Sequence, residues 1–235
     1  EKAITEIRRA LSVAPNFGDA HNYLGAIYFH VGLIEEATAE FRRAEEIMPG
    51  EGTRFHLGLM AMFQGRYDEA AATMEKNKNS FVAPFVESQI CFALFDAGHV
   101  SAARDRIAKA RAKLTDEGGL MAATQGLLFA AAGDKEHAEQ NIEQALKEGQ
   151  GFGHFHHTTY AVASAYALLH ENAPALQWLK YTADHGFPNL TWFLRDPALA
   201  PLRDNPAFTR LSDEMRPRFE KMKALADAPL TIAQD

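Results

Sequence analysis

The chain has 235 residues, of which 47% are hydrophobic and 23% charged, and its net charge is −7. This is ordinary globular composition, and an acidic chain without a basic stripe is not a typical nucleic-acid binder. The single cysteine, Cys91, excludes an intrachain disulfide, and no apolar run approaches the length of a membrane span. These features favour a cytoplasmic location and leave a periplasmic one open.

The first element expected is a helix within residues 1–17, where Ala3, Ile7 and Leu11 form an apolar stripe. The chain starts at Glu1 in the middle of this pattern, without an initiator Met or a signal peptide, so we expect a fragment of a larger protein. A repeat helix without its partner leaves an apolar face open. We therefore expect this face to fray or to be covered by a neighbouring molecule, which would allow self-association.

A glycine followed five positions later by an alanine then recurs with a period of about 34 residues. The glycines are Gly32, Gly65, Gly98 and Gly133, and the alanines are Ala37, Ala70, Ala103 and Ala138. Each glycine is expected to end a helix in the left-handed conformation. The preceding helix carries a small residue where two helices would cross, at Gly25, Gly58, Cys91 and Gly126.

Residues 18–50 carry the fullest pattern, with Leu24-Gly25-x-x-Tyr28, Ala37-x-x-x-Phe41 and Pro49. This pattern resembles the tetratricopeptide repeat (TPR) family. The resemblance implies an all-α fold, a right-handed α-solenoid of helix-turn-helix repeats. Its units would be a half repeat at residues 1–17 and repeats at about 18–50, 51–83, 84–118, 119–153 and 156–185.

After residue 185 the repeat stops, and we expect a helical C-terminal cap at residues 186–228 and a disordered tail at 229–235. Asp196-Pro197 and Asn205-Pro206 are typical of helix starts, with an N-cap residue followed by a proline in the first turn. The stretch is similar to the D-P-x-L-x-x-L-R-x-x-P-R-F tail of TPR arrays in bacterial signalling proteins, with Ala207 in place of the arginine. The buried side of the cap should consist of Trp192, Phe193, Leu199, Leu202, Phe208 and Leu211.

The stretch "GFGHFHHTTY" concentrates three histidines, His154, His156 and His157, just where the helix after residue 153 should begin. A zinc site on a helix usually needs ligands three or four residues apart and a third ligand converging on them, and only Glu148 lies nearby. We favour a polar, glycine-flanked helix start over a metal-binding or proton-sensing role. No catalytic constellation, metal site or cofactor motif is expected elsewhere, so the chain is predicted not to be an enzyme.

In TPR arrays the first helix of each pair lines a concave groove. Mapped onto this chain, the groove carries only two charged residues, Asp19 and Asp96, and no Lys or Arg that could grip a chaperone peptide's carboxylate. The predicted partner-binding residues are Tyr23, Phe29, Phe55, His56, Met62, Phe63, Phe92, Phe95 and Tyr160. Such a lining suits an apolar or amphipathic segment. The alternative is that these side chains are internal packing or lie under the chain's own C-terminal helices.

These expectations together predict a non-enzymatic protein-interaction module, the C-terminal part of a larger bacterial protein, whose partner is a protein or peptide with an apolar or amphipathic segment. The alternative is a ligand-sensing region of a bacterial signalling enzyme or transcription regulator, with a small or lipidic ligand in the groove.

Overall fold

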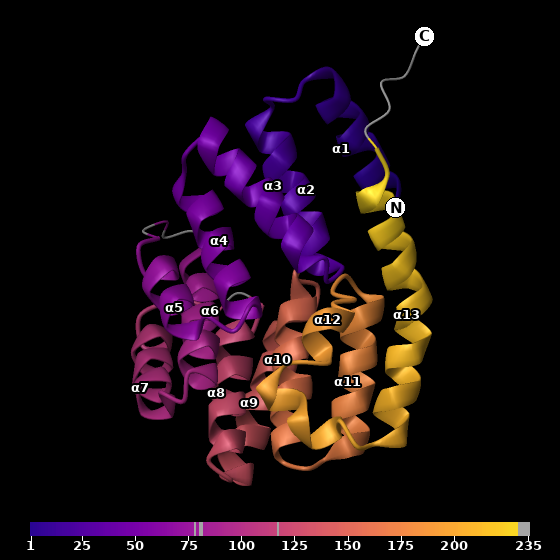
Figure 1. Ribbon diagram of the computed structural model, residues 1–235. Coiled ribbons are helices and arrows are strands. Elements are labelled where there is room, and N and C mark those ends of the chain that lie inside the picture. Colours follow the sequence, from indigo (N-terminus) through magenta and orange to yellow (C-terminus); the bar gives the residue numbers. More distant parts are fainter. Residues whose placement is uncertain (78, 80–81, 117, 230–235) are drawn as a thin grey trace.

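The computed structural model describes residues 1–77, 79, 82–116 and 118–229, and within them the secondary structure is helical, without strands. Consecutive helices pack as pairs: α2 (Gly18–His30) with α3 (Ile34–Ile47), α4 (Glu51–Phe63) with α5 (Tyr67–Met74), α6 (Ala83–Asp96) with α7 (Val100–Arg111), α8 (Leu120–Ala131) with α9 (Lys135–Glu148), and α10 (Phe155–Leu168) with α11 (Asn172–Asp184). This confirms the predicted all-α solenoid of helix-turn-helix repeats (Figure 1). None of the described helices combines the length and apolar character needed to cross a bilayer.

The small residues of the repeat lie where the two helices of a pair cross. A Cβ atom placed on Gly25 would lie 2.9 Å from the ring of Phe41, and one on Gly58 would lie 2.7 Å from Cγ of Met74. Cys91 is fully buried at the equivalent position of α6, and burial raises the pKa of its thiol to about 12. Side-chain volume at these positions therefore sets how closely the paired helices approach.

The turns within the pairs use left-handed backbone, as the sequence predicts. Their glycines have positive φ angles of 86°, 81°, 83° and 74° at Gly32, Gly65, Gly98 and Gly133. In the turn between α10 and α11 this role falls to His170, with φ of 60°. A side chain in this conformation costs free energy that glycine avoids.

We expect His170→Gly to raise the free energy of unfolding by about 0.5–1 kcal/mol, because relief of the left-handed strain exceeds the entropy cost of a new glycine. Gly133→Ala is the converse control, since a Cβ there meets no atom within 4 Å and only the backbone conformation is penalised. It should cost about 1–2 kcal/mol. Denaturant midpoints measure both, and a midpoint lowered by His170→Gly would contradict the assigned turn.

The first helix, α1 (Lys2–Val13), does not have the open face that the sequence predicts. Ile4 and Leu11 are buried, Ile7 is partly buried, and Ala3 is exposed. The last helix, α13 (Pro206–Asp227), packs against α1, and Arg8 donates a 2.7 Å hydrogen bond to the carbonyl of Ala226. Helix α1 therefore packs against both α2 and the chain's own C-terminal helix α13, and its apolar stripe is not open as predicted.

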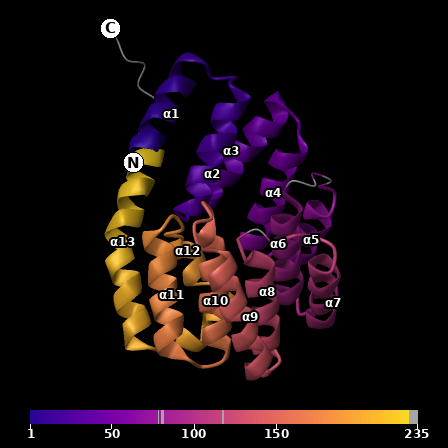
Figure 2. The ribbon, with the colours of Figure 1, turned by 180° about the vertical axis from the view of Figure 1, so that it is seen from behind.

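The two ends of the solenoid thus meet. Figures 1 and 2 show α13 running along α11 and ending beside α1. Lys221 of α13 forms an ion pair with Glu1 at 2.7 Å, and Lys223 forms one with Glu36 of α3 at 3.0 Å. The C-terminal cap therefore contacts both the last and the first parts of the repeat array.

The cap begins with the short helix α12 (Leu190–Phe193) and the 3-10 helix η2 (Pro197–Leu202). The side chains of Asp196 and Asn205 accept hydrogen bonds from the backbone amides that open η2 and α13, which confirms the two predicted helix starts. The predicted buried side is confirmed for all its members: Trp192, Phe193, Leu199, Leu202, Phe208 and Leu211. The predicted tail lies, apart from Pro229, outside the described residues.

Candidate functional site

The predicted partner-binding residues fall into three groups by exposure. Those that are buried are Phe29, Phe55, Met62, Phe63, Phe92 and Tyr160. His56 and Phe95 are partly buried. Tyr23 is 65% exposed.

Residues 187–193, which we call the covering segment, lie against three members of the buried group: Phe29, Phe63 and Tyr160. The ring of Phe187 is 5.6 Å from the rings of both Phe29 and Tyr160, and the ring of Trp192 is 4.4 Å from that of Phe63. The side chain of Asn189 donates a 2.9 Å hydrogen bond to the carbonyl of Phe29, at the end of α2. Here the aromatic lining is internal packing under the chain's own C-terminal segment, and a partner would reach it only by displacing that segment.

A small cavity remains between the covering segment and the repeats. Its volume is about 20 Å³, and it is lined by Phe29, Met62, Phe63, Gln89, Phe92, His157, Tyr160, Phe187 and Trp192. This is room for about one water molecule. A lipid or other small organic ligand does not fit this space while the covering segment is in place.

Two carboxyl groups are buried at one edge of this region. Asp96 ends α6, and both its side-chain oxygens are buried without a hydrogen-bond partner. Burial, and secondarily repulsion from Asp196, raise the pKa of Asp96 well above its ordinary value. Burial also raises the pKa of Asp196, although the hydroxyl of Tyr160 and the amide of Ala198 donate hydrogen bonds to its carboxyl group. We interpret the burial of the Asp96 carboxyl group without a hydrogen-bond partner as a destabilising feature of the fold.

The raised pKa of Asp96 makes the stability of the fold depend on pH. Because the folded pKa of Asp96 lies above its unfolded value of 3.8, the folded state binds this proton more tightly, and stability is lost as pH rises above the unfolded value. Tyr67 and Asp196 also face this group, while Arg203 partly offsets the charge of Asp196. Asp96→Asn should therefore stabilise the protein by about 1–3 kcal/mol at a pH of about 8 and have less effect near pH 5.

Urea unfolding of the wild type and Asp96→Asn at both pH values measures this difference. The exposed Asp105→Asn is the control for loss of one negative charge. An equal gain for Asp96→Asn at both pH values would show that the ionisation of Asp96 is not the cause.

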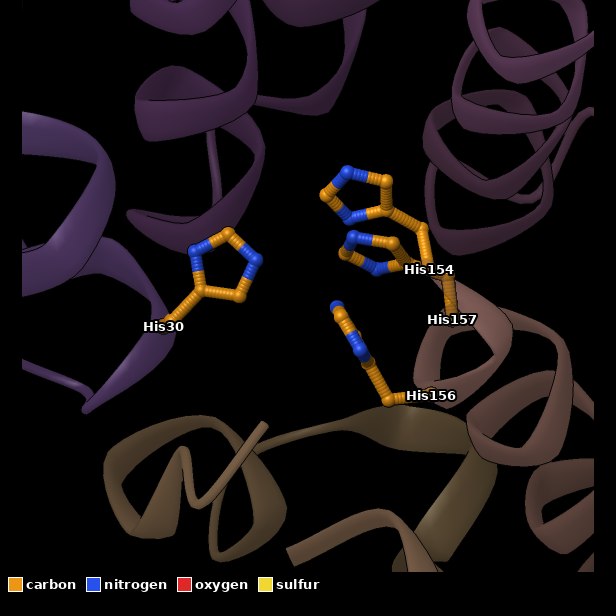
Figure 3. Close-up of side chains that lie close together, drawn as sticks. All are labelled: His30, His154, His156 and His157. Carbon is orange, nitrogen blue, oxygen red and sulfur yellow. The ribbon is translucent and has the colours of Figure 1, made fainter. Parts of the chain in front are cut away.

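Four histidines meet on the inner side of the fold. His30 is the last residue of α2, while His154 caps α10 and His156 and His157 lie in its first turn. Each offers a ring nitrogen, and these four atoms lie within 4.8 Å of one another. Figure 3 shows the His30 ring on one side facing the three other rings across a shared space. We call this group the histidine cluster.

The rings of His30, His156 and His157 in the histidine cluster have pKa values below the ordinary value of an imidazole, which favours their neutral form. Burial, together with the neighbouring histidines, lowers the pKa of His156 to about 4 and that of His157 well below its ordinary value. Burial also lowers the pKa of His30. Neutral imidazoles present lone pairs, and the Nε2 atom of His156 is buried without a hydrogen-bond partner.

The sequence interpretation of this stretch was incomplete. It correctly places His156 near the start of α10, but it looks for a third ligand only nearby in sequence. The fourth member, His30, lies on α2, far from this stretch in the sequence. The His30 ring meets those of His156 and His157 and also lies 5.8 Å from the ring of Phe187 in the covering segment, long-range contacts for which the repeat pattern carries no signal.

No family model matches the chain, and no curated protein is similar to it. Among solved structures, the chain is similar to the crystal structure of YrrB, "a TPR protein with an unusual peptide-binding site". The similarity covers 88% of this chain and 97% of that one, with 15% sequence identity and a TM-score of 0.43.

Proposed function

We propose that the chain is a non-enzymatic protein-interaction module that binds an apolar or amphipathic segment of a partner protein at the edge of its first helix pairs. The observation that carries this proposal is the gathering of large exposed apolar side chains in that part of the chain. They are Val13, Phe17, Tyr23 and Met48, exposed by 79%, 51%, 65% and 47%. Apolar patches of this kind mark interaction sites on folded proteins.

These side chains come from elements that touch. Phe17 precedes α2, and Met48 follows α3. A Cβ atom placed on Gly18 would lie 3.1 Å from Cβ of Met48, so the start of α2, next to Phe17, contacts the end of α3. Val13 ends α1 just before the same turn, and Tyr23 is an exposed residue of α2. A partner segment could contact these residues without displacing the covering segment.

Two further features support the proposal. The TPR resemblance of residues 18–50 belongs to a family of interaction modules, and the tail from Asp196 to Phe208 is similar to tails of TPR arrays in bacterial signalling proteins. We accordingly propose a scaffold role in the cytoplasm. The alternative, sensing of a small or lipidic ligand in the groove, lacks this kind of support because the inner cavity has room for only about one water molecule.

A displayed library of peptides of about 15 residues tests the proposal, because that length spans a helix-in-groove contact. Peptides selected on the wild type are then titrated against Tyr23→Ser and against Leu194→Ser. Leu194 is the matched control, since it is also exposed and apolar but lies in the cap. We expect Tyr23→Ser to weaken binding by about 2 kcal/mol, as for a central apolar anchor, with little dependence on salt.

Leu194→Ser should bind the selected peptides as the wild type does. The proposal fails if the selection enriches no apolar or amphipathic peptide, or if the enriched peptides bind Tyr23→Ser and wild type equally.

A further inference from the structure

The histidine cluster joins two parts of the chain that the repeat order keeps far apart. His30 lies in the first complete helix pair, whereas His154, His156 and His157 open the fifth. The rings of His30 and His156 are 5.3 Å apart, and those of His30 and His157 are 5.5 Å apart. Side chains from the two pairs thus meet directly, on the inner side of the closed solenoid (Figure 3).

The spacing of the rings suits a tetrahedral metal ion. An ion bonded to four imidazole nitrogens at 2.0–2.1 Å would hold those nitrogens about 3.3 Å apart and the ring centres about 5 Å apart. In the cluster the ring centres of the pairs in contact are between 4.3 and 6.1 Å apart, and the ligand nitrogens lie within 4.8 Å of one another. The remaining difference requires only small rotations of the rings, whose terminal torsions are soft.

Two of the rings are also oriented as metal ligands usually are. The Nδ1 atom of His30 forms a 2.7 Å hydrogen bond with the carbonyl of Ala26, which fixes the ring and leaves Nε2 free. The Nδ1 atom of His156 faces the backbone at Gly186, where a Cβ atom would lie 3.0 Å from it, and its Nε2 atom is the buried one without a partner. In both rings Nε2 is the nitrogen left for an ion.

We propose that the histidine cluster binds one divalent first-row transition-metal ion, with Zn²⁺ as the best probe, and that this ion links α2 to α10. A donor set made only of imidazole suits Zn²⁺, Cu²⁺ or Ni²⁺ and disfavours Mg²⁺ or Ca²⁺, which prefer oxygen ligands. The N-terminus of α10 disfavours a cation, whereas the C-terminus of α2, where His30 lies, favours one, so the helix dipoles offset each other. His154 is exposed and gives an ion a route from solvent.

This proposal is independent of the proposed peptide binding. It is tested by titrating zinc into the untagged full chain after a chelator has removed bound metal. Isothermal calorimetry at a pH of about 7.5, where imidazoles are neutral, should give one ion per chain. His30→Gln and His154→Gln should each weaken zinc binding by at least about 10-fold, because each removes a ligand. His99→Gln is the control, since His99 is exposed and pairs with Asp68 away from the cluster.

A second measurement guards against variants that fail to fold. His154 is exposed, so His154→Gln should keep the circular dichroism and the metal-free melting temperature of the wild type. Zinc should raise the melting temperature of the wild type and of His99→Gln, and raise that of His30→Gln much less, because the ion joins two helix pairs. The absence of saturable zinc binding would overturn the proposal. So would equal zinc affinity of the wild type and folded His154→Gln and His30→Gln, which would indicate adventitious binding.

Discussion

Replacing Phe187 by alanine is expected to lower the free energy of unfolding by about 3–5 kcal/mol, the largest effect of any single substitution considered. Phe187 is 2% exposed and is the first residue of the covering segment. Its ring is in contact range of the rings of Phe29, Tyr160 and Phe193, which come from both ends of the repeat array and from the cap. Its loss leaves a cavity that rings held by several helices cannot collapse to fill.

Urea unfolding followed by circular dichroism measures this effect. The control is Phe17→Ala, since the ring of Phe17 is 51% exposed and its removal should change stability by no more than about 0.5 kcal/mol. If the two substitutions lowered the midpoint equally, the covering segment would not be packed in the core as described.

The second large effect is expected at a helix crossing. Gly58→Leu should destabilise the protein by about 1–3 kcal/mol or more, because the added side chain would meet Cγ of Met74 at 2.7 Å and its backbone nitrogen at 3.3 Å. Leucine favours the helical conformation over glycine by about 1 kcal/mol, so the measured loss is what remains after this gain. Thermal melting of the variant gives the net value.

The same helix supplies the matched control. Gly52 also lies in α4, but a Cβ atom there would meet nothing within 4 Å. Gly52→Leu should therefore leave the melting temperature unchanged or raise it slightly. A wild-type melting temperature for Gly58→Leu would mean that α4 and α5 do not cross at Gly58.

The repeat pattern was sufficient to predict the helix pairs because each of its residues has a local structural cause. Gly32, Gly65, Gly98 and Gly133 adopt the left-handed turn conformation that only glycine adopts without strain. Tyr28 and Phe41 are buried between helices, as the TPR resemblance implies. The prolines after Asp196 and Asn205 correctly predicted where the helices of the cap begin.

The closure of the solenoid could not be predicted in this way. It depends on contacts between residues far apart in sequence, such as the hydrogen bond from Asn189 to Phe29 and the packing of α13 on α1. The sequence pattern of an aromatic stripe on the first helix of a repeat is the same whether a partner protein or the chain itself covers the stripe. For this reason the sequence left both alternatives open for Phe29, Phe63 and Tyr160, and it did not bring His30 to the other histidines.

The central claim is that residues 187–193 cover the inner face of the repeats, and Trp192 reports on it directly. The chain has two tryptophans, so Trp178→Phe leaves Trp192 as the only tryptophan emitter. Trp192 is 4% exposed and its ring is 4.4 Å from that of Phe63. In this variant we predict blue-shifted emission that acrylamide quenches weakly. Emission at the wavelength of free indole in water, with full quenching by acrylamide, would show that the segment is open and would contradict the account.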